Sequence, residues 1–303
     1  MGLLLLTNEA RAKTWKRVFD DAGEEIILSE AAVSNPAAVS CLACWVPPAD
    51  LSVYPNLKAL LSTGAGVDQM PPLPEGVALV RCDVAGISEM VRDWVLMAVL
   101  MLQRQMPLYL QQARAGQWET HLTRSASAFR VGIMGMGRIG QLAARALGAC
   151  GFDVAGYSRS GRPVEGCEIY GPDRLAAFLG RTDILVCLLP LTAETRGMLN
   201  ADLFAQLPDG AMLVHAGRGA QLDMAALRGA LDSGRLASAM IDVTDPEPLP
   251  EGHWAWTHPQ LIVTPHIGAE TDAEAGAQHA LEVVRALRAG APIPGQVDRD
   301  AGY

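Results

Sequence analysis

The chain has 303 residues, of which half are hydrophobic and 19% are charged, so it can bury a large core and is not an intrinsically disordered protein. This length indicates two domains and excludes a single small module. The formal net charge is −9 and basic residues do not cluster in runs. Nucleic acid is therefore not an expected partner, because binding to a phosphate backbone needs a basic surface.

Short apolar runs alternate with a helical pattern in the first third of the chain. We predict strands at residues 3–7, 25–28, 40–45, 57–62 and 78–81 and a helix over residues 10–22, an alternation typical of a small α/β domain with a parallel sheet. The apolar run at residues 3–6 is too short for a signal sequence or a spanning helix. We expect a cytoplasmic protein with no membrane partner.

The cysteines are scattered through apolar segments. Cys41 and Cys44 match a C-x-x-C spacing, but no second pair or nearby histidine accompanies them, so we interpret them as buried strand residues. The histidines at positions 121, 253, 258 and 279 have no metal-ligand spacing either. We predict no metal site and no disulfide framework.

The middle and second half of the chain continue the α/β pattern. Ser88 is predicted as the N-cap of a helix that runs almost uninterrupted towards Tyr109 and Ala115, a candidate hinge or dimer arm. Strand-like runs follow at residues 130–134, 154–157, 184–189, 212–215, 237–243 and 261–264, with helices that begin near Arg138, Asp173, Asn200 and Asp223. This indicates a doubly wound sheet. A last helix over residues 273–289 passes back to the first domain.

A G-x-G-x-x-G motif at residues 135–140 follows a predicted strand and opens a predicted helix, the context of a dinucleotide-binding turn. Gly135 permits the tight turn, Gly137 lets a pyrophosphate approach the backbone, and Gly140 allows close packing of helix and strand. Arg138 and Ile139 begin the helix, whose N-terminal N–H groups bind anions. The alternative is a glycine-rich turn without a ligand.

Ser158, Arg159 and Ser160 follow the next predicted strand, where an NAD enzyme has an acidic residue for the ribose 2′-hydroxyl. A guanidinium pairs with a 2′-phosphate, and hydroxyl groups donate to it. We therefore predict NADP(H) as the preferred cofactor, with NAD(H) possible. The alternative interpretation is a solvated arginine on a polar loop.

Three further segments end predicted strands of the same sheet: His215-Ala216-Gly217-Arg218-Gly219, residues 242–250, and residues 264–269. With residues 45–48, 63–68 and 189–195, in this order, they resemble the D-isomer-specific 2-hydroxyacid dehydrogenase family, and within it the glyoxylate/hydroxypyruvate reductase A branch. The resemblance covers nearly the whole chain. His215 departs from it, since the family usually has asparagine there.

The resemblance implies an α/β fold of two Rossmann-like or flavodoxin-like domains, with doubly wound parallel sheets and a cleft between them. Residues 1–95 and 275–303 would form a discontinuous substrate-binding domain, and residues 96–274 the NAD(P)-binding Rossmann domain. A homodimer with residues 91–110 at the interface is also implied.

The resemblance also implies a catalytic set of Arg218, Glu247 and His266. Arg218 would hold the ketoacid carboxylate and polarise its carbonyl, His266 would donate the proton, and Glu247 would orient the imidazole and favour its charged form. Each has a structural alternative: Arg218 paired with Asp223, Glu247 as a solvated loop residue, and His266 bonded to a backbone carbonyl.

Other positions follow from the resemblance in the same way. The substrate would contact Trp45, Ala65, Gly66, Arg218 and His266, with backbone N–H groups of residues 64–67 forming an anion nest. Trp45 is equally compatible with a core position, and the loop with an ordinary turn. The implied cofactor contacts are Gly135, Gly137, Arg138, Ile139, Ser158, Arg159, Ser160, Leu189, Pro190, Thr195, Ala216, Gly217, Asp242 and Gly268.

The resulting hypothesis is NADPH-dependent reduction of a small 2-ketoacid, of the glyoxylate or hydroxypyruvate type, to the (R)-2-hydroxy acid. One alternative is a bulkier 2-ketoacid such as phenylpyruvate. The other is a non-catalytic, dinucleotide-sensing protein of the corepressor type.

Overall fold

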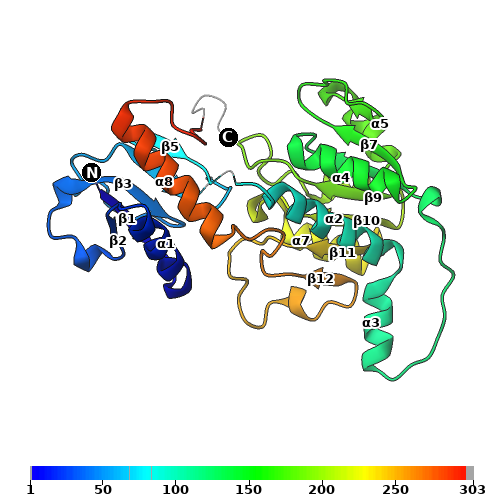
Figure 1. Ribbon diagram of the computed structural model, residues 1–303. Coiled ribbons are helices and arrows are strands. Elements are labelled where there is room, and N and C mark those ends of the chain that lie inside the picture. Colours follow the sequence, from blue (N-terminus) through cyan, green and yellow to red (C-terminus); the bar gives the residue numbers. More distant parts are fainter. Residues whose placement is uncertain (1, 68, 83, 298–303) are drawn as a thin grey trace. The chain divides into compact units, whose positions relative to one another are not determined.

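The computed structural model of the chain describes residues 2–67, 69–82 and 84–297 (Figure 1). The chain folds into two compact units: unit 1 comprises Met1–Ile87 and Glu270–Tyr303, and unit 2 comprises Ser88–Ala269. These divisions lie several residues from the sequence-predicted ones at 95/96 and 274/275. The first division lies earlier in the chain because Trp94 and Val95 pack with Val131 and Ile133 in the core of unit 2.

Unit 1 is a five-stranded parallel sheet in the order β2-β1-β3-β4-β5. Trp15 and Phe19 of the first helix pack with Ala277, Ala280 and Val284 of the last helix in one core cluster, so the second segment of the unit completes the core of the first. The elements are β1 (Gly2–Leu6), α1 (Glu9–Asp21), β2 (Ile26–Ile27), β3 (Val39–Cys44), β4 (Ala59–Ser62), β5 (Ala78–Val80) and α8 (Ala273–Ala289).

Cys41 and Cys44 lie on β3, and both side chains are fully buried. Burial raises the pKa of each thiol to about 12, because a thiolate is poorly solvated there. Both are free thiols, which confirms their interpretation as buried strand residues.

Unit 2 is a seven-stranded parallel sheet in the order β12-β11-β10-β9-β6-β7-β8. One core cluster packs α2 and α4 against the sheet and the other packs α5, α6 and α7, so helices cover both faces and the predicted doubly wound fold is confirmed (Figure 1). The elements are α2 (Ile87–Gln103), α3 (Met106–Arg114), β6 (Arg130–Met134), α4 (Arg138–Ala149), β7 (Asp153–Tyr157), β8 (Glu168–Tyr170), α5 (Leu175–Gly180), β9 (Ile184–Cys187), α6 (Ala201–Ala205), β10 (Ala211–His215), α7 (Met224–Asp232), β11 (Leu236–Ile241) and β12 (Leu261–Val263).

Two details of the helical segment differ from the sequence prediction. Ser88 is not an N-cap, because α2 already begins at Ile87, after Gly86 with φ +94°. The expected single helix is two helices, and Gln105 between them has the left-handed φ of 58°. Pro107 lies in the first turn of α3, where the backbone N–H groups have no partner within the helix, so the N–H that proline lacks is not missed there. A proline at this position cannot continue the hydrogen bonding of α2, so the first helix ends before it. Strand β8 was not predicted, because a strand of three residues is too short to show an alternation of apolar and polar side chains.

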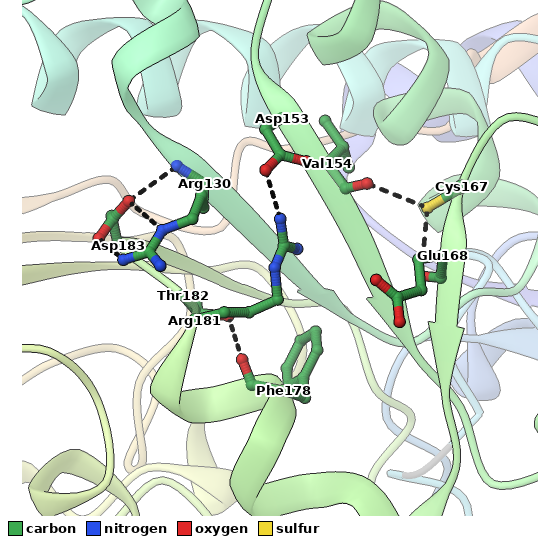
Figure 2. Close-up of polar contacts among 9 residues, drawn as sticks. All are labelled: Arg130, Asp153, Val154, Cys167, Glu168, Phe178, Arg181, Thr182 and Asp183. Carbon is green, nitrogen blue, oxygen red and sulfur yellow. Dashed lines mark hydrogen bonds and ion pairs between the residues drawn. The ribbon is translucent and has the colours of Figure 1, made fainter.

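Two ion pairs link neighbouring segments at the amino-terminal edge of the unit 2 sheet (Figure 2). Arg130 donates to both carboxylate oxygens of Asp183, at 2.8 and 3.0 Å, and Arg181 donates to Asp153 at 2.6 Å. Arg130 begins β6 and Asp153 begins β7, and Arg181 and Asp183 lie within the three residues before β9. The opposite, carboxyl-terminal edge is left for loops with other roles. In the part of the chain that the structure describes, no helix is both long and apolar enough to span a membrane.

Candidate active site

The six strands before the predicted site segments of unit 2 all run parallel, so their carboxyl ends meet at one edge. The order of strands reverses between β6 and β9, because β7 lies on one side of β6 and β9 on the other. Such a switch point is where open α/β sheets form a ligand crevice.

The glycine turn lies at this switch point. Gly135 has φ +104°, and a Cβ there would lie 2.7 Å from the Leu188 carbonyl oxygen, so only glycine fits. A Cβ at Gly140 would overlap the Gly135 carbonyl, whereas one at Gly137 would meet no atom within 4 Å. The backbone at Gly137, the N-cap of α4, is thus open to a ligand, while Gly140 packs the helix on the strand.

The loop after β7 is exposed at Arg159 and Ser160. Ser158 N–H donates to the Tyr170 carbonyl of β8 at 3.1 Å, and Gly161 N–H closes a turn on Ser158 at 3.2 Å. The predicted 2′-phosphate residues therefore lie on one accessible turn at the carboxyl edge of the sheet.

The loop after β9 is held by Thr195 and Gln221. The Thr195 hydroxyl donates to the Pro190 carbonyl at 2.7 Å and accepts from Thr192 N–H at 2.8 Å. The Gln221 amide donates to the carbonyls of Leu189 and Pro190, at 3.2 and 3.0 Å. The sequence analysis missed Gln221. Its position three residues after Arg218 is the one feature of the sequence that could have drawn attention to it.

Arg218 follows β10 and precedes the short 3-10 helix η5 (Gly219–Gln221). The next turn packs tightly, since a Cβ at Gly219 would overlap the Thr244 carbonyl of the loop after β11. Asp223 Oδ1 accepts from Ala225 and Ala226 N–H as the N-cap of α7, and among the ion pairs of the described residues the alternative pairing of Asp223 with Arg218 does not occur.

Glu247 and His266 are brought together from the ends of β11 and β12. Glu247 Oε2 is 2.9 Å from His266 Nδ1, and Glu247 Oε1 accepts from Thr244 N–H at 2.9 Å. The hydrogen bond to Glu247 raises the pKa of His266, although burial opposes the charged ring. Burial alone would raise the pKa of Glu247, but the contacts with His266 and Thr244 and the charges of His266 and Arg218 lower it. The contact expected for this pair is present.

His266 has a left-handed φ of 53°, which is uncommon for a residue with a Cβ. Asp242, 3% exposed, holds this backbone: its carboxylate accepts from the Thr264 hydroxyl at 2.5 Å, from Ile267 N–H at 2.9 Å and from Gly268 N–H at 2.7 Å. Strained backbone of this kind persists where the surroundings over-determine it. Asp242, which the family resemblance assigns to the cofactor, therefore also fixes the backbone of the loop that carries His266.

Unit 1 carries the remaining predicted residues. Trp45 is 42% exposed, so its core alternative is wrong; its ring lies over Gly64, where a Cβ would be 2.8 Å away. Ser62 Oγ donates to the Gly66 carbonyl at 2.6 Å and shapes the loop. Within the described residues, the amides of Ala65 and Gly66 donate to no protein acceptor, as an anion nest requires. Asp68, the end of this motif, lies outside the described residues.

Among the described residues, no group of three or more His, Cys, Asp or Glu side chains is arranged to hold a metal ion. On α2, Arg92 Nη2 pairs with Asp93 Oδ1 at 2.7 Å.

The family model for the NAD-binding domain of D-isomer specific 2-hydroxyacid dehydrogenases matches residues 96–268. Glyoxylate/hydroxypyruvate reductase A from Salmonella heidelberg is 36% identical over 279 residues, which cover 89% of this chain and 89% of that protein.

Solved structures show the same similarity over the full chain. An NADPH-dependent glyoxylate/hydroxypyruvate reductase from Sinorhizobium meliloti, in complex with NADP and sulfate, is 38% identical with a TM-score of 0.90, and the match covers 100% of this chain and 99% of that one. A D-isomer specific 2-hydroxyacid dehydrogenase from Xanthobacter autotrophicus Py2, in complex with NADPH and MES, is 35% identical with a TM-score of 0.87, covering 100% and 99%.

Proposed function

The chain belongs to the D-isomer specific 2-hydroxyacid dehydrogenase family and is an NAD(P)-dependent oxidoreductase, and we propose that it uses NADPH to reduce a small 2-ketoacid, of the glyoxylate or hydroxypyruvate type, to the (R)-2-hydroxy acid. The observation that carries the proposal is the hydrogen-bonded pair of Glu247 and His266, at 2.9 Å, beside the charge of Arg218. Together these groups match the needs of a carbonyl reduction, namely a proton donor and a carboxylate-binding cation.

The glycine turn supports the cofactor assignment. The open backbone at Gly137 and the N-terminal N–H groups of α4 fit a pyrophosphate, and the exposed Arg159 turn fits a 2′-phosphate. Bound NADPH supplies the hydride. The residues proposed to hold it are Gly135, Gly137, Arg138, Ile139, Ser158, Arg159, Ser160, Leu189, Pro190, Thr195, Ala216, Gly217, Asp242 and Gly268.

The proposed role of Arg218 is to bind the substrate. A guanidinium pairs with the carboxylate of a 2-ketoacid in a fixed plane and polarises the neighbouring carbonyl. This interaction grows stronger as the carbonyl oxygen gains negative charge during hydride attack, so it favours the transition state over the ground state. In unit 1, Trp45 and the amides of Ala65 and Gly66 are proposed as substrate contacts.

The proposed role of His266 is to donate a proton from Nε2 to the forming alkoxide, because Nδ1 is occupied by Glu247. The raised pKa of His266 favours the imidazolium that this step needs. In the oxidation direction, the neutral ring accepts the alcohol proton. Glu247 keeps the ring oriented in both directions.

We also propose that the protein is a homodimer with residues 91–110 at the interface. Met97, Leu108 and Leu110 of this segment are 40%, 36% and 37% exposed. Burying such side chains against a second copy removes apolar surface from water, which favours association.

A substrate panel tests the proposed function. The protein is mixed with NADPH and glyoxylate, hydroxypyruvate, pyruvate or phenylpyruvate, and loss of the reduced nicotinamide absorbance is followed. We expect turnover with the small ketoacids and loss of turnover in His266→Ala, which still binds NADPH. If no 2-ketoacid is reduced, the proposal is wrong. If only phenylpyruvate is reduced, the substrate class is wrong and the reaction type stands.

A further inference from the structure

Two buried side chains hydrogen-bond to the backbone of Arg218. Its N–H donates to Gln221 Oε1 at 2.7 Å, and its carbonyl lies 3.0 Å from His215 Nε2. Both His215 and Gln221 are 0% exposed. The peptide groups before and after the Arg218 Cα are therefore fixed, and they set the position of the Cα and the direction of the Cα–Cβ bond.

The tautomer of His215 follows from this contact. Burial lowers the pKa of His215 to about 4, so the ring is neutral near pH 7 and carries one N–H. A carbonyl oxygen only accepts, so the hydrogen is on Nε2 and the bond is a donation to Arg218. Nδ1 is buried and makes no hydrogen bond within the described residues. His215 thus gives its single donor to the Arg218 carbonyl.

Gln221 connects two loops. Its Oε1 accepts from Arg218 N–H, and its amide nitrogen donates to Leu189 and Pro190 of the loop after β9. Both hydrogens of the amide are used, which is the expected state of a fully buried glutamine. Gly217 leaves the space for it, since a Cβ there would overlap Gln221 Oε1.

From these contacts we infer that His215 and Gln221 are positioning residues of the active site: both fix Arg218 for the substrate carboxylate, and Gln221 also fixes the loop of Leu189 and Pro190 for the cofactor. The inference rests on the proposed function, because it assigns Arg218 to the ketoacid and residues 189–190 to NADPH. Neither residue touches the reacting atoms in this assignment. Their loss is expected to act on binding through the groups that they hold.

Matched variants separate this role from a general contribution to stability. His215→Gln keeps an uncharged donor of similar reach, whereas His215→Leu keeps the bulk of the side chain and removes the donor to the Arg218 carbonyl. Gln221→Met keeps the length and removes all three hydrogen bonds. Thr182→Val is the control, because it removes one buried hydrogen bond, to Phe178 at 2.7 Å, at the opposite edge of the sheet (Figure 2).

Each variant is characterised by kcat and KM for the best ketoacid, by the Kd of NADPH from fluorescence titration, and by Tm. The Kd of oxamate, an unreactive 2-ketoacid analogue, for the NADPH complex reports on Arg218 without turnover. We expect His215→Leu to raise KM and the oxamate Kd about tenfold at unchanged NADPH affinity, and His215→Gln to keep both near the wild-type values. Gln221→Met raises the Kd of NADPH as well. Thr182→Val lowers Tm alone.

The inference is overturned if His215→Leu and Gln221→Met keep KM and the oxamate Kd within about twofold of wild type. It is also overturned if Thr182→Val raises KM as much as they do, because the effect is then one of stability. If the wild-type protein neither reduces a 2-ketoacid nor binds oxamate, the proposed function itself is wrong and this inference falls with it. Wild-type turnover with insensitive variants refutes only the positioning role.

Discussion

Replacing Glu247 by glutamine tests the proposed acid–base pair most directly. The variant keeps a side chain of the same shape but removes the carboxylate that raises the pKa of His266. Reduction needs the imidazolium, so activity is present below the pKa of His266 and is lost as the pH rises through it. Without the carboxylate that pKa falls, and we expect the alkaline limit of kcat/KM for reduction to move to lower pH. The acidic limit for oxidation moves in the same direction.

The size of the effect follows from the geometry. Glu247 Oε2 and His266 Nδ1 are 2.9 Å apart, and the two side chains are 38% and 33% exposed. A hydrogen bond to a charged group contributes about 1.5–3 kcal/mol, and water screens part of it at this exposure, which leaves about 1–2 kcal/mol. The expected fall in kcat/KM for reduction near neutral pH is therefore about five- to thirty-fold.

The assay is a pH series of kcat/KM in both directions, followed by nicotinamide absorbance. Glu251→Gln is the matched control, because it removes an exposed carboxylate from the same loop, and its profile is expected to match that of the wild type. An alkaline limit that stays in place or moves to higher pH in Glu247→Gln would refute the assignment of Glu247. Equal shifts in the control would attribute the effect to net charge.

Three further outcomes are expected. Arg159→Ala weakens NADPH binding about tenfold and leaves NADH binding unchanged, whereas Arg162→Ala changes neither; a retained preference in fluorescence titrations contradicts the 2′-phosphate role. Gly219→Ala lowers the free energy of unfolding by about 1–3 kcal/mol through overpacking, whereas Gly229→Ala, in a helix with open space at its Cβ, does not; equal denaturant midpoints refute the clash. Light scattering gives the mass of a dimer that Leu108→Glu converts to a monomer, and a monomeric wild type disproves the dimer.

The site could be predicted to the extent that it depends on strand ends. The spacing of the glycines in residues 135–140 is enough to predict the turn that they form. Arg218, Glu247 and His266 each follow an apolar run that predicts a strand. Because the strands are parallel, these ends meet at one edge of the sheet whatever the loops do between them. The contact between Glu247 and His266, 19 residues apart, was reached by family resemblance, and no spacing rule gives it.

The sequence by itself determined the α/β class, the doubly wound order of elements and the position of the nucleotide turn, because hydrophobic periodicity reports which faces are buried. Only the tertiary structure decided the break between α2 and α3, the strained backbone of His266 and the contacts made by Asp242. It also decided the role of Gln221, whose amide meets carbonyls 31 and 32 residues away. A buried polar group takes whichever partner the fold brings within reach, and the order of residues along the chain does not specify that partner.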